Sequence, residues 1–121
     1  VSESVDPFHM TSVDYFERWG REPVERIFSR FDGGVIHLHG NGRHLLTAVS
    51  TVRGLKAVHA ADDRDFPPAF EVLADLKASA GAVPLGVNAE ECKASFENGL
   101  LTLELPKVEQ AKAKSIKVVA K

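Results

Sequence analysis

The stretch Val35–His59, VIHLHGNGRHLLTAVSTVRGLKAVH, decides how this chain is interpreted. An apolar run ends in a turn bracketed by two glycines, an amphipathic run follows, and a second apolar run closes the stretch. This order is typical of a β-α-β unit, in which a crossover helix joins two parallel strands. Ligands of such sheets bind beyond the carboxyl ends of the strands. The polar residues at that end are His37, His39, Asn41, Arg43, His44 and His59.

Composition limits the classes of protein that this chain can represent. Its 121 residues fit one domain, whereas a complete (β/α)₈ barrel needs about 250. A formal net charge of -2 gives no electrostatic reason to expect nucleic acid or an acidic membrane as a partner. The single Cys92 cannot form an internal disulfide, and no apolar run approaches the ~20 residues that span a bilayer. We therefore expect a cytoplasmic protein.

The regions around this unit predict further helices and strands. A polar loop over residues 1–10 precedes a helix that begins near Thr11, is interrupted at Pro23 and ends before residues 32–34. A second helix follows the Pro67-Pro68 pair and stops at Gly81, and residues 83–87 predict a third strand. Near residue 88 the sequence pattern changes from alternating helices and strands to a hairpin. This change marks a candidate domain boundary.

Residues 93–105 predict a β-hairpin. Two short runs flank Asn98-Gly99, a dipeptide that favours tight turns between antiparallel strands. Leu101, Leu103 and Leu105 alternate with polar residues, which indicates one buried and one solvated face. These leucines either cover the core of this chain or form a surface for other molecules.

Residues of about 8–88 resemble the carboxyl-terminal half of the uroporphyrinogen decarboxylase superfamily, which includes the corrinoid methyltransferases. The matching strings are YFERWGREPVERIFSRF, GGVIHLHGNGRHLL and GLKAVHA, in the order strand, helix, strand, helix, strand. The resemblance implies an α/β fold: a partial (half) TIM-barrel-like βαβαβ segment, here with a carboxyl-terminal β-hairpin. Any enzymatic activity would be that of a decarboxylase or methyltransferase, although half a barrel argues against a complete enzyme.

Residues of about 86–121 resemble the end of the small heat-shock protein (α-crystallin) domain. The matching string is GVNAEECKASFENGLLTLELPKVEQAKAKSIKVVAK. The resemblance implies an ATP-independent chaperone or oligomerisation module built on a β-sandwich. It also implies that Ile116 and Val118, in a terminal Ile-x-Val motif, dock on a neighbouring subunit. Leu101, Leu103 and Leu105 would then contact other subunits or client proteins.

His37 and His39 are the candidate metal ligands. Two residues apart on a strand, they share one face and can converge on one ion, with a third ligand from His59, Asp62 or Asp63. In the methyltransferase branch, the strand matching VIHLHG has a His-x-Cys pair that binds zinc, so zinc is the possible cofactor, with one ligand type changed here. The alternative is that both histidines are half-buried strand residues bonded to their neighbours.

The candidate ligand-binding residues are Asn41, Arg43, His59 and Asp62. Backbone N–H groups of the glycine-bracketed turn, together with a guanidinium, can bind a carboxylate or phosphate. The alternative is an ordinary turn in which glycine supplies a positive φ, followed by a solvated acidic loop. No catalytic residue is assigned.

The whole chain is therefore interpreted as a composite. Residues 1–88 form the barrel-fragment segment and residues 89–121 the hairpin and tail, both packed into a single domain. The first functional hypothesis is a decarboxylase-like fragment that retains binding of an anionic ligand or metal. The second is the heat-shock-like module, which would form a homo-oligomer through its hairpin or tail. The third is an artificial or accidental chimera without biochemical activity.

Overall fold

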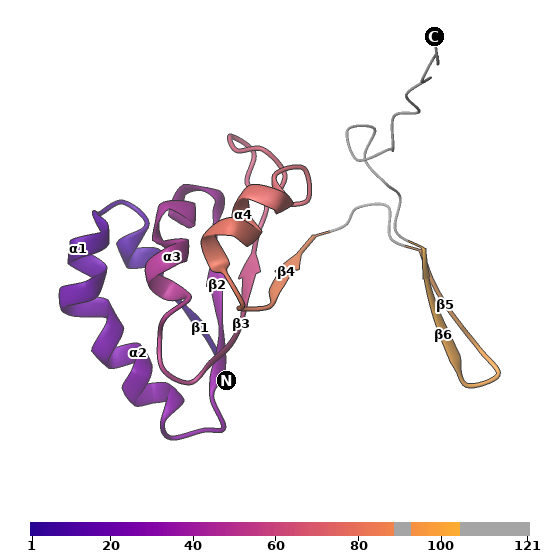
Figure 1. Cartoon of the computed structure of the whole chain (residues 1–121), viewed down its shortest axis with the longest axis horizontal. Helices are drawn as coiled ribbons and strands as arrows, with labels where there is room; N and C mark the ends of the chain where they lie inside the picture. The colour runs from indigo at the N-terminus through magenta and orange to yellow at the C-terminus, as the bar shows by residue number, and fades with distance from the viewer. Residues whose placement is uncertain (89–92, 105–121) are drawn as a thin grey trace, which may run out of the picture. The chain divides into compact units, whose positions relative to one another are not determined.

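The computed structural model describes residues 1–88 and 93–104. The chain divides into two compact units, Val1–Asn88 and Ala89–Lys121. Each unit has its own sheet, four-stranded in the first and two-stranded in the second (Figure 1). The two units are described separately below.

The first unit is built on a parallel sheet in which the strands follow one another in chain order. Its strands are β1 (Ser2–Ser4), β2 (Gly34–Leu38), β3 (Leu55–Ala60) and β4 (Leu85–Val87). The register aligns His37 of β2 with His59 of β3, and Ser4 of β1 with the same His37. The β-α-β unit of residues 35–59 is therefore present as two adjacent parallel strands.

Short helices connect the strands of this sheet. Between β1 and β2 are η1 (Asp6–Phe8), α1 (Val13–Tyr15), the π-helical turn η2 (Phe16–Gly20) and α2 (Arg21–Phe28). Between β2 and β3 are η3 (Gly40–Leu45) and α3 (Leu46–Val49), and α4 (Leu73–Ala80) precedes β4.

The first helical region runs without a gap from Val13 to Phe28, so the break predicted at Pro23 takes the form of a change in helical geometry. The π-helical turn over Phe16–Gly20 ends three residues before Pro23, which lies in the first turn of α2 and has no backbone N–H to donate. Arg21 then joins α2 to α3: its Nη2 donates to the carbonyl oxygen of Ala48 at 2.9 Å, and its Nε donates to Glu17 at 2.5 Å.

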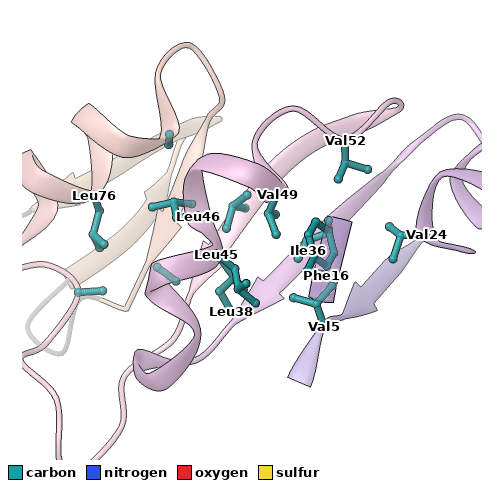
Figure 2. Packing of buried hydrophobic residues seen from close by; sticks show 14 of the residues in the cluster. Val5, Phe16, Val24, Ile36, Leu38, Leu45, Leu46, Val49, Val52 and Leu76 are labelled. Atoms are coloured by element: carbon teal, nitrogen blue, oxygen red, sulfur yellow. The ribbon is translucent and has the colours of Figure 1, made fainter. Parts of the chain in front are cut away.

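The core lies on one face of this sheet. Burial alternates along β2, where Ile36 and Leu38 are buried and Val35 and His37 are half-buried. Figure 2 labels Phe16, Ile36, Leu38 and Leu45 within this one cluster of buried side chains. Successive side chains of a strand point to opposite faces of the sheet. The odd-numbered residues of β2, including His37, therefore lie on the face opposite the core.

The predicted fold class, a half TIM-barrel-like βαβαβ segment, is wrong. The sheet is open and has four strands rather than three, with β1 in the region predicted as a polar loop. The helices are few and short, with three residues in α1 and four in α3, whereas a barrel has a ring of full helices around its strands. The strand β1 escaped prediction because Ser2–Ser4 is polar and joins the sheet through its backbone.

The second unit contains the hairpin of β5 (Lys93–Glu97) and β6 (Leu100–Glu104). The two strands are antiparallel, which confirms the hairpin predicted from the sequence. Asn98 and Gly99 form the turn with φ of 51° and 80°, the left-handed conformations that a two-residue type I′ turn requires. Leu105, Ile116 and Val118, like Cys92, lie outside the described residues.

Candidate functional site

The carboxyl ends of β2 and β3 bring three histidines together. His37 and His59 are direct neighbours in the parallel register, and His39 follows β2 by one residue. All three are half-buried, on the sheet face opposite the main core. The sequence placed His37 and His39 on one face, and the register adds His59.

The three imidazoles form one row of close nitrogen contacts. His37 Nδ1 lies 3.0 Å from His59 Nδ1, and His37 Nε2 lies 3.2 Å from His39 Nε2. At one end, His39 Nδ1 is 2.9 Å from Asp63 Oδ1. At the other end, His59 Nε2 is 3.2 Å from Asn88 Oδ1. Every ring nitrogen in the row therefore has one polar partner.

Asp63 ties the loop after β3 to the end of β2. Its Oδ2 accepts a hydrogen bond from the backbone N–H of Gly40 at 2.5 Å, while its Oδ1 faces His39. The hydrogen bond to His39 holds the pKa of the Asp63 carboxyl below its usual value, and the Gly40 N–H acts in the same direction. Asp63 is therefore the negative end of the row.

His37 occupies the middle of the row, where its surroundings disfavour the charged form of its imidazole. Burial lowers the pKa of its imidazole, and the neighbouring His39 and His59 lower it further. The carboxylates of Asp6 and Asp63 act in the opposite direction without reversing the shift. The neutral form of His37 is thus favoured in the folded chain.

Arg43 and Asp62, two of the candidate ligand-binding residues, already have partners within the protein. The guanidinium of Arg43 donates to the carbonyl oxygen of Pro67 at 2.7 Å and to that of Ala61 at 3.4 Å. Asp62 accepts from the backbone N–H of Ala69 at 2.6 Å. Asp62 closes the loop of residues 61–69 on itself, and Arg43, from η3, binds two carbonyl groups of the same loop. Anion binding by these two side chains stays a prediction.

Asn41, the remaining candidate, lines a pocket of about 410 Å³ beside His39. The residues that line it are Asp6, His9, His39, Asn41, Asp63, Asp65 and Phe66. Asp6, Asp63 and Asp65 give this pocket an acidic wall. It therefore offers little attraction to the anionic ligand that the sequence suggested.

His9 is a residue of this region that the sequence did not single out. It is 5 % exposed, and its Nδ1 lies 3.4 Å from Asp6 Oδ1. Burial lowers the pKa of its imidazole, with the carboxylate of Asp6 opposing the shift. The residue escaped notice because residues 1–10 were predicted to be a loop. Asn88 escaped because only the register of β4 brings it to His59.

The glycines of the turn after β2 serve close packing rather than a positive φ. Neither Gly40 nor Gly42 has a positive φ. A Cβ on Gly42 would collide with the ring of His9, and one on Gly40 would lie 2.6 Å from the ring of Phe66. The predicted role of glycine in this turn is therefore replaced by a steric one.

No metal centre is found in the part of the chain that the structure describes. Among residues 1–88 and 93–104, no group of three or more His, Cys, Asp and Glu side chains is arranged to hold an ion. His37 and His39 instead direct their Nε2 atoms at each other. At 3.2 Å these two atoms are within hydrogen-bond distance, and zinc binding by the pair stays a prediction.

The hairpin supplies a second candidate site. Its register pairs Ala94 with Leu103 and Phe96 with Leu101. Leu100, next to the turn, is 69 % exposed. A two-stranded hairpin alone is marginally stable in water, and a third strand or another packing surface is what stabilises it.

Comparison with known proteins assigns part of the chain. Residues 79–120, about a third of the 121, match the model of the Hsp20/alpha crystallin family. No curated protein and no solved structure matches the chain. The small heat-shock resemblance of the carboxyl-terminal part is thus supported, and nothing supports the decarboxylase or methyltransferase resemblance.

The matched segment crosses the boundary between the two units. It begins inside α4 and includes β4, which is paired with β3 in the parallel sheet, and it continues through β5 and β6. Its start therefore adds a second reason against a barrel-like assignment of residues 1–88. No helix in the described parts of the chain is long and apolar enough to cross a membrane.

Proposed function

We propose that this chain is an ATP-independent chaperone or self-assembly module whose working part is the segment of residues 79–120. The observation that supports this proposal most directly is the match of that segment to the Hsp20/alpha crystallin family. The antiparallel β5–β6 hairpin within the segment is a second, structural support. Homo-oligomerisation is the corresponding partner proposal, since proteins of this family typically assemble.

The hairpin has a physical reason to associate. Two strands bury too little apolar surface to be stable on their own, so a further strand or a hydrophobic partner lowers their free energy. Each outer edge of such a pair also presents backbone groups that another strand can bond. In this proposal Leu101, Leu103 and Leu105 contact a second subunit or a client protein, and Ile116 and Val118 dock on a neighbouring subunit.

The experiment compares the mass of the full chain in solution with that of a variant lacking residues 115–121, by light scattering after size-exclusion chromatography. We expect the full chain to form an oligomer and the shortened chain a smaller species. A double variant, Ile116→Ser with Val118→Ser, should have the same effect, because it removes the apolar side chains and keeps the chain length. Lys117→Ala, between them, is the matched control and should leave the mass unchanged.

The chaperone arm measures how well each variant suppresses the light scattering of a heat-denatured client protein without ATP. We expect suppression by the full chain at near-equimolar ratio and a loss of suppression when Leu101 and Leu103 are both replaced by Ser. A full chain that is monomeric and leaves client aggregation unchanged would contradict the proposal. Assembly without suppression would restrict the function to self-association.

A further inference from the structure

The pocket of about 410 Å³ beside the carboxyl end of β2 lies where ligands of parallel sheets bind. Three segments that are far apart in the sequence form its wall: the turn after β1, the residues that follow β2 and the loop after β3. The described residues that line it include three carboxylates, those of Asp6, Asp63 and Asp65, and neither Lys nor Arg. No cationic side chain within this lining therefore balances the negative charge of the wall.

The two nearby arginines lie outside the lining. Arg43 acts on the carboxylate of Asp63, but its guanidinium already donates to two backbone carbonyl groups of the loop after β3. Arg64 lies between Asp63 and Asp65 in the chain and is exposed. The charge of the wall thus favours a cationic ligand over an anionic one, and charge alone does not say which cation.

His9 adds a buried polar atom to this pocket. The residue lines the pocket and is only 5 % exposed. Its Nδ1 lies 3.4 Å from Asp6 Oδ1, and because a carboxylate only accepts, the neutral imidazole has its hydrogen on Nδ1. Nε2 is then an acceptor, and in the part of the chain that the structure describes it has no hydrogen-bond partner. A buried acceptor without a partner costs free energy, so a ligand that donates an N–H to Nε2 gains affinity.

The lining suits an organic cation better than a bare metal ion. Within residues 1–88 and 93–104, no three His, Cys, Asp or Glu side chains are grouped to hold a metal ion. A primary ammonium group has one positive charge and three N–H donors, which can reach acceptors that are too dispersed to coordinate one ion. The ring of Phe66, which also lines the pocket, offers an aromatic surface to the charge or to the attached carbon chain.

We propose that this pocket binds the primary ammonium group of a small organic amine. The carboxylates of Asp6, Asp63 and Asp65 balance its charge. His9 Nε2 accepts one of its N–H groups, and Phe66 contacts its first methylene groups. The site is independent of the chaperone proposal, because its lining residues, between 6 and 66, lie outside the segment 79–120. A free amine and a lysine side chain share this chemistry, and the experiment separates them.

The test is isothermal titration calorimetry of the full chain at about 10 mM salt, where charges are little screened. The probe is n-butylammonium, and tetramethylammonium is the matched cation without an N–H. We expect saturable binding of n-butylammonium at one site and binding of tetramethylammonium at least about tenfold weaker, because tetramethylammonium cannot donate to His9. No saturable binding of n-butylammonium, or equal affinity for the two cations, would overturn the proposal.

A third ligand, Nα-acetyl-lysine methylamide, identifies the source of the ammonium group. Affinity equal to that of n-butylammonium supports the site with a lysine side chain as its ligand. Much weaker binding of the lysine derivative supports the site with a free amine as its ligand.

Two variants test the assigned residues. Asp65→Asn removes one carboxylate at an exposed position and should weaken n-butylammonium binding by about threefold or more. Asp75→Asn, the same change at an exposed position of α4 outside the lining, is the matched control and should weaken it clearly less. His9→Phe keeps an aromatic ring and removes Nε2, so it should erase the preference over tetramethylammonium, with circular dichroism to check the fold. Unchanged affinity in Asp65→Asn would overturn the proposal, whether or not His9→Phe folds.

Discussion

The two units of this chain obtain their order from different sources. In residues 1–88, side chains from every layer meet in one core, which includes Phe16, Ile36 and Leu38, all at most 1 % exposed. In residues 93–104, the order comes from a turn and one antiparallel ladder. A folding unit with its own core tolerates isolation, whereas an isolated ladder does not. The comparison teaches that the hairpin, which is only part of the segment matched to a known family, depends most on contacts beyond its own ladder.

The largest effect is expected from removing a core side chain of the first unit. Phe16 is fully buried and its ring lies 5.7 Å from that of Phe8, edge to face. Phe16→Ala should lower the free energy of unfolding by about 3–5 kcal/mol, because it removes buried apolar surface and leaves a cavity. Urea denaturation followed by circular dichroism measures this loss.

Trp19→Ala is the matched control on the same helical turn. Trp19 is 59 % exposed, so its loss should change the free energy of unfolding by less than about 0.5 kcal/mol. The hairpin amide resonances should survive in both variants. If Phe16→Ala also abolishes those resonances, the two units are not independent.

A smaller effect is expected from the turn of the hairpin. Gly99 has a φ of 80°, and replacing it with Ala places a Cβ in a conformation that L-residues disfavour. Gly99→Ala should destabilise the hairpin by about 1 kcal/mol, visible as a loss of cross-strand contacts between Phe96 and Leu101 in NMR spectra. The thermal midpoint of the first unit should stay constant.

Asn98→Gly is the control for that change, since glycine retains the left-handed conformation that the turn needs. Cross-strand contacts should persist in this variant. A shift of the thermal midpoint of the first unit in Gly99→Ala would show that the hairpin stabilises the first unit. That result would contradict the view that the two units are ordered independently.

The smallest expected effect is a dependence on pH that only the first unit shows. All five histidines lie in residues 1–88 and none in the hairpin. Folding lowers the pKa of His37 below the ordinary histidine value of about 6.5. Below that pH the unfolded chain therefore binds more protons than the folded chain. Stability is thus fully present above pH 6.5 or so and decreases as pH falls through the folded pKa.

The measurement is the urea midpoint of the first unit between pH 8 and 5. His37→Gln should flatten the part of this slope that His37 contributes, while the hairpin population should not change over the window. A slope of the same size in His37→Gln would assign it to other groups.

Short sequence patterns predicted local structure such as turns and helix ends. They did not predict the pairing of strands that are far apart in the sequence. The hairpin follows from Asn98-Gly99 between alternating runs, and the end of α4 from Gly81, whose φ is +61°. The strand β1 could not be predicted, because its pairing depends on Val35 some thirty residues away rather than on its own apolar content.

In the candidate site, too, the sequence indicated the local arrangement and not the long-range contacts. A two-residue spacing places His37 and His39 on one face, which the sequence alone indicates. That His59 and Asn88 complete the row depends on the parallel registers of β3 and β4. The need for glycine at position 42 depends on the ring of His9, which no local pattern connects to it. The resemblance implied a barrel from three short matching strings and from the order of helices and strands, and neither determines how a sheet closes.

The position of β4 has a consequence for the ancestry and engineering of this chain. The family match begins at residue 79, whereas the first folding unit ends at Asn88. A recombination or cloning cut at residue 79 would remove the edge strand of the parallel sheet and expose β3, which pairs with it through Val58, His59 and Ala60. A cut after residue 88 would keep the sheet whole and shorten the family segment. The border of the family match and the border of the first folding unit therefore differ, and residues 79–88 belong to both.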